Sequence, residues 1–407
     1  MNSSELPNAT LPRRRLLAFT AVGGLSAALW SIRLPPTWPP VISVPTGYAR
    51  PTGAGYQPFE KLAQRGSITA TASTVSPNAS VTFASGTFSC KDFAVAHTYG
   101  VMFTSNVTGV YGSGSAKTVF QMTPGTSTQA KSIPAQKSGG TNQLCLMRVG
   151  DGWSNAPSSR PYQVAGFTLL GTTQPVDPKT GKPQTYNGLR LYSCKGVKVY
   201  DVLVKGIPGS SDFNPGETFS VCDYRSVNTS MQNVEVDGRN SAGVPVAGSG
   251  MGFNFTNGLT TTNCFSHDTA YGHGITHYQC TGAITHTDFA STNTGIPINF
   301  EQCVATINLV RFSAQANRAV TSAGDKKPGT PIFAVIDSSL GSSKVTITDP
   351  TMNGLTPTPS NPLVVVVHKT YNGAKQLQKT SDIRLVLSGR VRSDCIRFAT
   401  NENIPFA

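Results

Sequence analysis

The chain reads GFNFTNGLTTTNCF at residues 252–265, GITHYQCTGAITHTDF at 274–289 and PINFEQCVATINLVRF at 297–312, three copies of one pattern. Apolar residues recur after 22 residues from Phe253 to Ile275 and after 23 from Ile275 to Ile298. Within each copy they alternate with polar residues, which is a strand signal. Three strands of about four to five residues and three corners use about 22 residues. Each copy therefore predicts one coil of a solenoid whose turns stack in parallel about 4.8 Å apart.

A fourth stretch extends the pattern. NGLRLYSCKGVKV at 187–199 resembles the coil phrase of right-handed parallel β-helix proteins of the pectate-lyase-like superfamily, and the resemblance covers residues 68–400. It implies an all-β fold, a single right-handed parallel β-helix with coils of about 22 residues, long side loops and a C-terminal β cap. This scaffold serves lyases, hydrolases, epimerases, tailspikes and adhesins, so the resemblance implies a fold more firmly than an activity.

The ends of the chain differ from its middle. Residues 13–15 are Arg and precede an apolar run from Leu16 to Trp30, which resembles a twin-arginine export signal. A membrane anchor formed by residues 16–32 is the alternative, and cleavage is left open. We predict an export signal or anchor at 1–32, a Pro/Gly-rich linker at 33–66, the β-helix at 67–330, and final coils with a β cap at 331–407. The protein is expected to be secreted or anchored at the cell surface.

The eight cysteines do not have metal-site spacing, because no CxxC pair occurs. Cys194, Cys280 and Cys303 fall at the same corner of their coils, where small apolar side chains pack in a column. Stacked free thiols and one or two disulfides both remain open for an exported protein. We predict no cofactor and assign no metal ligands; calcium is left open, although the acids form no clear calcium-ligand cluster.

Four histidines gather in one stretch: His267, His273, His277 and His286. In the repeat alignment His277 matches Phe255 and Phe300, so it is expected to point into the core. His267, Asp268 and His273 fall in a corner where exposure is expected. They are candidates for substrate contact, or turn residues that hydrogen-bond the backbone.

The tripeptide Gly272-His273-Gly274 matches the G-H-G of polygalacturonases, but the paired acids that glycosidic hydrolysis needs are missing one coil earlier. A lyase needs an Arg or Lys base and neutralisation of a uronate carboxylate. We assign the candidate residues as follows: Asp223, His273 and Glu301 as acid or base, Arg225 for carboxylate neutralisation, Tyr278 for stacking, and Asn254, His267, Asp268 and Asn299 for substrate contact. An ordinary solvated β face is the alternative.

The net charge is +13, from 33 Lys and Arg against 20 Asp and Glu, and favours polyanionic partners. Outside a cell these are acidic polysaccharides or cell-wall glycans. Nucleic acid is not expected, because aromatic residues do not interleave a basic groove. We predict that the protein binds such a glycan, and cleavage by a lyase or glycosidase reaction is left open. The alternative is a non-catalytic glycan-binding adhesin or a tailspike-like structural protein. We expect a monomer, or a trimer if the protein is tailspike-like.

Overall fold

The computed structural model describes residues 56–58, 79–90, 99–103, 107–122, 144–150, 162–171, 186–209, 219–270, 272–316, 333–337, 341–369 and 381–399. All of them belong to one compact unit, Pro39–Ala407. The predicted signal and most of the predicted linker lie outside the described residues. Among those described, no helix has the length and apolarity to cross a bilayer.

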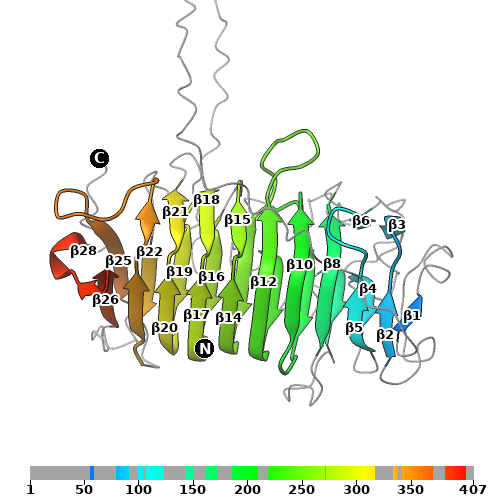
Figure 1. Cartoon of the computed structure of the whole chain (residues 1–407), viewed down its shortest axis with the longest axis horizontal. Helices are drawn as coiled ribbons and strands as arrows, with labels where there is room; N and C mark the ends of the chain where they lie inside the picture. Colours follow the sequence, from blue (N-terminus) through cyan, green and yellow to red (C-terminus); the bar gives the residue numbers. More distant parts are fainter. Residues whose placement is uncertain are drawn as a thin grey trace, which may run out of the picture. The chain divides into compact units, whose positions relative to one another are not determined.

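The described chain is a stack of parallel coils, which confirms the all-β parallel β-helix (Figure 1). One sheet has ten strands that pair in parallel in coil order. They are β4 (Tyr99–Phe103), β7 (Leu144–Val149), β9 (Tyr186–Tyr192), β11 (Phe219–Tyr224), β13 (Ser249–Asn254), β16 (Ile275–Tyr278), β19 (Ile298–Glu301), β22 (Phe333–Asp337), β25 (Leu363–Lys369) and β28 (Ile396–Ala399).

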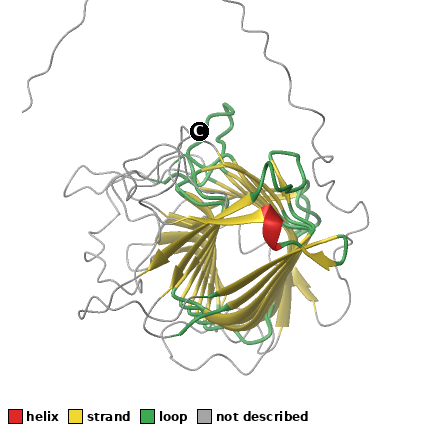
Figure 2. Cartoon of the chain, turned by 90° about the vertical axis from the view of Figure 1, so that its left-hand side faces the viewer, coloured by secondary structure: helices red, strands yellow, loops and turns green. Residues whose placement is uncertain are grey.

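The other sheet has eighteen strands and bends around the remaining sides of the coil, so that the strands enclose one interior (Figure 2). They are β1 (Tyr56–Pro58), β2 (Ala79–Thr82), β3 (Gly86–Cys90), β5 (Val107–Tyr111), β6 (Thr118–Met122), β8 (Gln163–Leu170), β10 (Lys198–Lys205), β12 (Val227–Asp237), β14 (Asn257–Thr262), β15 (Phe265–His267), β17 (Thr281–Thr287), β18 (Ala290–Thr294), β20 (Val304–Val310), β21 (Ser313–Ala316), β23 (Lys344–Thr348), β24 (Thr351–Met352), β26 (Asp382–Leu387) and β27 (Arg390–Val391).

The last strands close the described stack. β27 pairs antiparallel with β26, the only antiparallel pair of strands among the described residues. A short 3-10 turn, η3 (Ser393–Cys395), then leads into β28, which joins the ten-stranded sheet beside β25. A change of strand direction interrupts the parallel pairing at this end of the described solenoid.

The register of the coils differs from the predicted one at its first step. Ile275 pairs with Ile298, as expected, but the partner of Ile275 on the preceding coil is Met251, and Phe253 pairs with His277. The predicted alignment of Phe253 with Ile275, and of His277 with Phe255, was therefore wrong by two residues. Alternation has a period of two, so a slip of two residues keeps every side chain on its predicted face and is invisible in the pattern.

Inward side chains form columns along the stack. Met251, Ile275 and Ile298 make one column, and Phe253, His277 and Phe300 make the next. His277 is fully buried, and its ring is stacked between Phe253 at 5.3 Å and Phe300 at 4.3 Å. The inward orientation predicted for His277 is confirmed. Each buried phenylalanine contributes on the order of 2 kcal/mol by leaving water.

A small-residue column lies beside these, at the corner that follows the ten-stranded sheet. It contains Cys194, Cys280 and Cys303, each of which is buried and donates its thiol to a main-chain carbonyl of the same or the preceding coil. The seven cysteines whose side chains are described are all free and buried. Free thiols thus occupy these seven positions, and three of them form the stacked column.

A hydrogen-bonded histidine pair crosses the interior. His277 Nδ1 lies 3.2 Å from the main-chain oxygen of Asn299, which can only accept, so this nitrogen carries the proton. Its Nε2 then accepts from His286 Nε2 at 2.9 Å, and His286 Nδ1 accepts from the Thr261 hydroxyl at 2.7 Å. Both rings are neutral. Burial lowers the pKa of His277 to about 3, and burial with the neighbouring His277 also lowers that of His286.

This pair predicts acid lability. Below the ordinary histidine pKa of about 6.5 the unfolded chain takes up two protons that the folded chain excludes, so stability falls with falling pH. His277→Phe/His286→Leu copies residues of the same columns, Phe300 and Leu309, and is expected to reduce the loss of unfolding free energy between pH 7 and pH 5. Urea titrations of both proteins at the two pH values test this, and equal losses would contradict it.

The single variant His277→Phe is the control for packing. It keeps the stacked ring but removes the acceptor of His286 Nε2, and an unpaired buried donor costs roughly 1–3 kcal/mol. We expect it to be less stable than the double variant at pH 7.

Candidate functional site

Five successive corners carry the candidate site, those that follow β9, β11, β13, β16 and β19. At each, the last outward-facing residue of the strand is followed by a residue with positive φ. We call these ten positions the corner strip: Tyr192, Ser193, Tyr224, Arg225, Asn254, Phe255, Tyr278, Gln279, Glu301 and Gln302.

Main-chain pairing aligns the strip. At four of the five corners the amide of the positive-φ residue donates to the carbonyl of the strand-end residue one coil on, as from Arg225 to Asn254 at 2.9 Å and from Phe255 to Tyr278 at 2.8 Å. The side chains of neighbouring corners are consequently held at the strand spacing of about 4.8 Å. This regular spacing turns isolated corner residues into a continuous row.

Aromatic rings and arginines interleave along the row. Tyr192 and Tyr224 stack at 5.1 Å with an interplanar angle of 20°, and Phe255 packs edge-on against both Tyr224 at 5.5 Å and Tyr278 at 5.4 Å. The Arg225 guanidinium lies 5.2 Å from the Tyr224 ring centre and 5.6 Å from that of Phe255. These are distances for aromatic and cation–π attraction, so the row is preformed. Tyr192 and Tyr224 are themselves buried, and Arg225 and Phe255 are the partly exposed members of this group.

Two further arginines extend the basic half of the strip. Arg148 and Arg190 are register partners on the outer face of β7 and β9, and both are buried. Arg148 lies 5.0 Å from the centre of the Tyr192 ring, and Arg190 lies 5.7 Å from that ring and from Tyr224. Positive charge is therefore concentrated on the coils of β7, β9 and β11.

The other half of the strip is acceptor-rich. Tyr278 and Glu301 are register partners, and Gln279 Nε2 donates to the Tyr278 hydroxyl at 3.1 Å and to Gln302 Oε1 at 2.9 Å. Burial raises the pKa of Glu301, and burial together with the Glu301 charge raises that of Tyr278.

The structure brings together four of the predicted site residues: Arg225, Asn254, Tyr278 and Glu301 all lie on the corner strip. Asn299 lies on the same face as Glu301, two residues earlier on β19, and is buried. Sequence reasoning missed Tyr224 and Phe255. The signal for Tyr224 is a recurring aromatic or polar residue two positions before the buried small residue, as in YSC at 192–194 and YQC at 278–280. Phe255 lies one position later in that phrase, directly before the buried Thr256.

Asp223 does not belong to this surface. Its side chain faces the interior in the column of Leu191 and Phe253, it is fully buried, and it accepts a hydrogen bond from Thr229 at 2.6 Å. Burial raises its pKa to about 6, while hydrogen bonds from neighbouring hydroxyls lower it. Its neighbours Cys222 and Tyr224 take the outward positions, so alternation along β11 directs Asp223 inward. The predicted contact of Asp223 with a substrate does not fit this placement.

His273 lies in the segment before β16 and is held through its backbone. Its N–H donates to Ser249 Oγ at 3.2 Å and its carbonyl accepts from the Gly250 amide at 2.8 Å. The glycines around it are sterically required, since a Cβ on Gly272 would lie 2.1 Å from Ser249 Oγ and one on Gly274 would lie 1.7 Å from Ser291 Oγ. Close packing of coils accounts for the two glycines of the tripeptide, and a role of His273 as acid or base stays a prediction.

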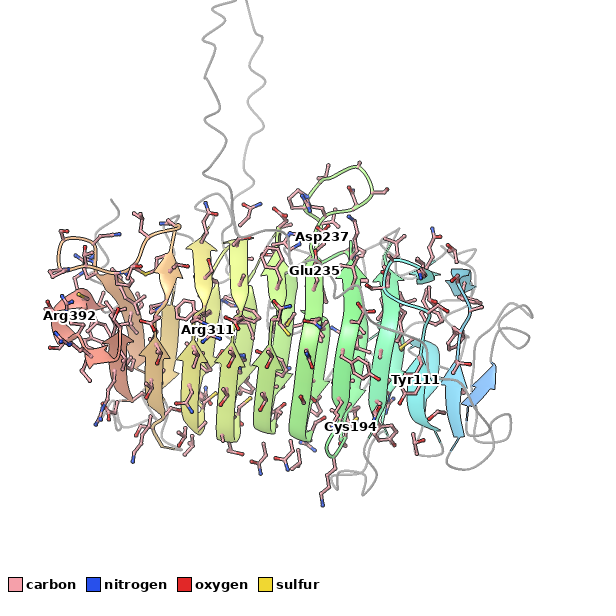
Figure 3. The ribbon with its side chains drawn as sticks, viewed as in Figure 1. Tyr111, Cys194, Glu235, Asp237, Arg311 and Arg392 are labelled. Carbon is pink, nitrogen blue, oxygen red and sulfur yellow. The ribbon has the colours of Figure 1, made fainter. Side chains whose placement is uncertain are left out.

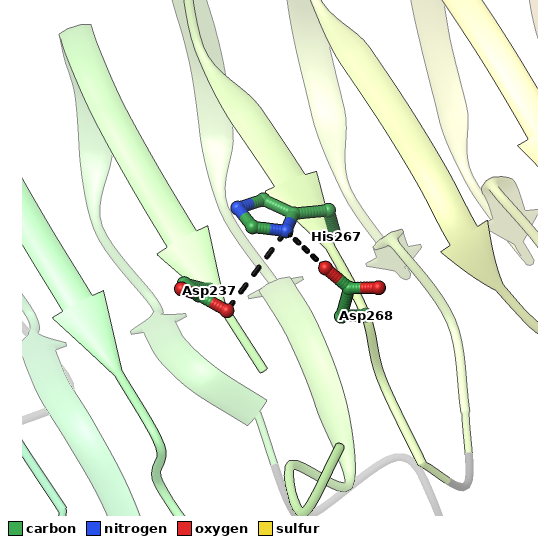
Figure 4. Close-up of side chains that lie close together, drawn as sticks. All are labelled: Asp237, His267 and Asp268. Atoms are coloured by element: carbon green, nitrogen blue, oxygen red, sulfur yellow. Dashed lines mark hydrogen bonds and ion pairs between the residues drawn. The ribbon is translucent and has the colours of Figure 1, made fainter. Parts of the chain in front are cut away.

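His267 and Asp268 belong to a second cluster, on the eighteen-stranded sheet (Figure 4). His267 Nδ1 donates to Asp268 Oδ2 at 2.6 Å and lies 3.9 Å from Asp237 Oδ1, and its Nε2 lies 3.1 Å from Glu235 Oε1. Register places Asp237 beside His267 on the neighbouring coil, which is why residues so far apart in sequence meet.

Neighbouring cations balance the carboxylates of the cluster. Arg239 contacts Asp237 at 2.8 Å and Asp268 at 3.2 Å, and Lys205 contacts Asp237 at 2.9 Å. Burial opposes charging of His267, but hydrogen bonds to Asp268 and Glu235 outweigh it and raise the pKa to about 9. Burial likewise opposes charging of Asp237, but Arg239 and Lys205 hold its pKa at about 2.

A metal ion would compete with these partners. Ligand atoms of Asp237, His267 and Asp268 lie within 4.8 Å of one another, which the sequence did not predict. Binding of a metal ion there requires His267 to lose the Nδ1 proton that it donates to Asp268, and Arg239 to give up its contact with Asp237. The donor set in its present protonation state fits an ion-pair network better than a metal site.

The two sites are far apart. Glu235 and Asp237 lie near one end of the strands and Cys194, which marks the first corner, near the other (Figure 3). The corner strip and the His267 cluster therefore cannot contact the same sugar residue, and the predicted joint role of His267, Asp268 and Tyr278 in one substrate contact does not fit.

Comparisons with known proteins give structural similarity only. No family model matches the chain, and a search of curated proteins found no match. Among solved structures the chain is similar to PfbA, a surface adhesin of Streptococcus pneumoniae, with 12% identity, a TM-score of 0.46, and 79% of this chain and 71% of that one covered. It is also similar to a family 28 exopolygalacturonase of Yersinia enterocolitica, with 10% identity, a TM-score of 0.41, and 85% and 77% covered.

A third similar structure is the tailspike of an Acinetobacter phage, with 12% identity, a TM-score of 0.38, and 84% of this chain and 64% of that one covered. An adhesin, a glycosidase and a tailspike are thus all among the neighbours. At these identities and scores the similarity says nothing about activity, and the fold assignment rests on the strand pairing.

The His267 cluster predicts alkaline sensitivity. The pKa of His267 in the folded protein, about 9, exceeds its value in the unfolded chain. The contribution of the protonated ring to the free energy of unfolding is therefore complete below about pH 6.5 and is lost as the pH rises through 9. The shift corresponds to roughly 3 kcal/mol. We expect His267→Gln to remove most of the stability difference between pH 6 and pH 9.5 in urea unfolding. A variant that keeps the wild-type pH slope would show that the cluster does not stabilise the protonated ring.

Proposed function

We propose that the protein binds an extracellular acidic polysaccharide along the corner strip. Arginine guanidinium groups pair with carboxylates in a planar, charge-assisted geometry. Aromatic faces pack against the apolar faces of sugar rings, and the net charge of +13 attracts a polyanion over a distance. The strip combines these three features in one row on consecutive coils.

The observation that carries the proposal is the conformation of Phe255 and Arg225. Their φ angles are 57° and 58°, in the left-handed region that disfavours bulky side chains. Such residues cost on the order of 1–3 kcal/mol and gather at binding sites. Polar Gln279 and Gln302 occupy the same position on the next coils with φ of 49° and 54°. In this conformation, which Arg311 shares at another corner (φ 50°), the Phe255 ring and the Arg225 guanidinium meet at 5.6 Å and both stay partly exposed, which supports a binding role.

Cleavage of the glycan is the second candidate. Glu301 has a raised pKa beside Tyr278, as a general acid requires. Glycoside hydrolysis in most families uses two carboxyl groups, and Glu301 is the single carboxyl group on the corner strip. Binding without cleavage, as in an adhesin or a tailspike-like structural protein, accordingly has the stronger support. Export to the cell surface or medium remains a proposal that rests on residues 1–32.

The first prediction concerns the aromatic platform. Phe255→Gln introduces the residue that the next two corners carry, so the fold should keep its stability. Loss of one aromatic and cation–π contact, about 1–2 kcal/mol, should weaken binding of polygalacturonate about tenfold. Isothermal titration calorimetry measures the affinity and thermal unfolding the stability. Ser388→Gln is the control, because Ser388 also has positive φ (48°) but lies at another, exposed corner. Unchanged affinity in Phe255→Gln would exclude the strip.

The second prediction concerns charge. Arg225→Gln should weaken binding of the same polymer and make the remaining affinity less dependent on salt, since one charge pair fewer is screened. Titrations between low and physiological ionic strength give the slope. Product assays by absorbance of unsaturated ends and by reducing ends, run on the same samples, test cleavage. Products that disappear in Glu301→Gln would favour the second candidate.

A further inference from the structure

Glu301 is the one carboxylate in the described part of the chain that has no partner. No hydrogen bond or ion pair reaches its side chain, although it is only partly exposed. Every other carboxylate whose side chain is described has such a partner, including the exposed Asp349, Asp382 and Asp394. An unpaired carboxylate on a candidate binding row therefore points to a ligand that supplies the partner.

Two buried polar atoms beside Glu301 also lack a partner. Within the described residues, Thr276 Oγ1 and Asn299 Oδ1 are buried and make no hydrogen bond. They are register partners on the outer faces of β16 and β19, one outward position before Tyr278 and Glu301. A buried polar atom is costly to leave unpaired and native proteins keep few of them, so two on neighbouring coils indicate a ligand group that completes them.

Register brings these groups together in one patch. Tyr278 pairs with Glu301 as Thr276 pairs with Asn299. The four outward side chains therefore leave the sheet about 4.8 Å apart across the coils and about 6.7 Å apart along each strand. We call these four residues the β16/β19 patch. At these spacings, one small group above the sheet lies within reach of all four side chains.

The patch is suited to a protonated amine. The Glu301 carboxylate and Asn299 Oδ1 only accept hydrogen bonds, and the Thr276 hydroxyl can accept as well as donate. An ammonium group brings three donors and the positive charge that Glu301 lacks, and the face of the Tyr278 ring attracts a cation. A sugar hydroxyl is uncharged and forms the weaker bond with Glu301. A carboxylate can accept from the Thr276 and Tyr278 hydroxyls but leaves Glu301 without a counterion.

We infer that the β16/β19 patch binds a protonated amino group, so that the acidic polysaccharide recognised by the corner strip also carries amino sugars without N-acyl groups. This inference rests on the proposed function and names a second chemical group of the ligand. Glu301 is the counterion of the amine and thereby determines specificity.

The test compares two hexasaccharides that differ in one group only. Both alternate glucuronate with glucosamine, and the amino groups are free in one and N-acetylated in the other. Calorimetry on the full-length protein is run at about pH 6.5, below the pKa of amino groups. We expect the free-amine hexasaccharide to bind at least about tenfold more tightly, a difference of about 1.4 kcal/mol. The net charge of +13 alone predicts the opposite order, because the N-acetylated chain is the more negative of the two.

Two variants locate the effect. Glu301→Gln keeps the size of the side chain but removes its charge, so it should weaken binding of the free-amine hexasaccharide about tenfold and change that of the N-acetylated one less than about twofold. Asp382→Asn is the matched control, because it removes one exposed carboxylate from β26 in the other sheet and should keep the preference. Thermal unfolding checks that both variants are folded.

Three results overturn the inference: equal wild-type affinities, tighter binding of the N-acetylated chain, or a preference that survives Glu301→Gln, which would mean that the acetyl groups clash with the protein. The proposed function stands in these cases if Phe255→Gln weakens binding of both hexasaccharides. If neither hexasaccharide binds, the inference and the proposed function both fail. If Phe255→Gln changes neither affinity while Glu301→Gln removes the preference, the corner strip is excluded and the amine site at the β16/β19 patch stands.

Discussion

The parallel register of the coils is the constraint on which the rest of the structure depends. Each strand of the ten-stranded sheet pairs with the same position one coil away, so each corner must turn at the same place. A left-handed residue makes that turn and aligns its amide with the next corner, as for Phe255 and Tyr278. Side chains at these corners are then stacked at strand spacing, whatever their chemistry. The same constraint produces the thiol column of Cys280 and Cys303 inside and the aromatic row outside.

Two kinds of polar group are buried by this arrangement, and they are stabilised differently. In the interior, His277 and His286 satisfy each other as neutral rings, with Thr261 and a main-chain carbonyl at the two ends of the chain of hydrogen bonds. At the end of strand β15 in the eighteen-stranded sheet, His267 is instead held in its charged form by Asp268 and Glu235. The difference follows from the partners, because hydroxyls and carbonyls stabilise a neutral ring and carboxylates stabilise a cation.

The corner strip departs from what stability alone would choose. Asparagine, aspartate or glycine fit a left-handed corner best, and at the corner between β14 and β15 and its successors the chain uses Asn263, Asp288 and Asp349, with Arg311 as the exception. On the strip it places Arg225 and Phe255. Their contacts with Tyr224 recover part of the cost, yet both remain partly exposed. The conformational cost that these contacts do not recover supports the proposed role of the corner strip in recognition.

The sequence by itself determined the coil, the strand faces and the inward position of His277, because alternation is a local property that one strand displays alone. It also identified Arg225, Asn254, Tyr278 and Glu301 as candidate site residues. Only the tertiary structure decided which residues are neighbours across coils: Phe253 with His277, Asp237 with His267, and Phe255 between two tyrosines. Those partnerships depend on loop lengths and on main-chain pairing between distant strands, and a slip of two residues leaves the local pattern unchanged.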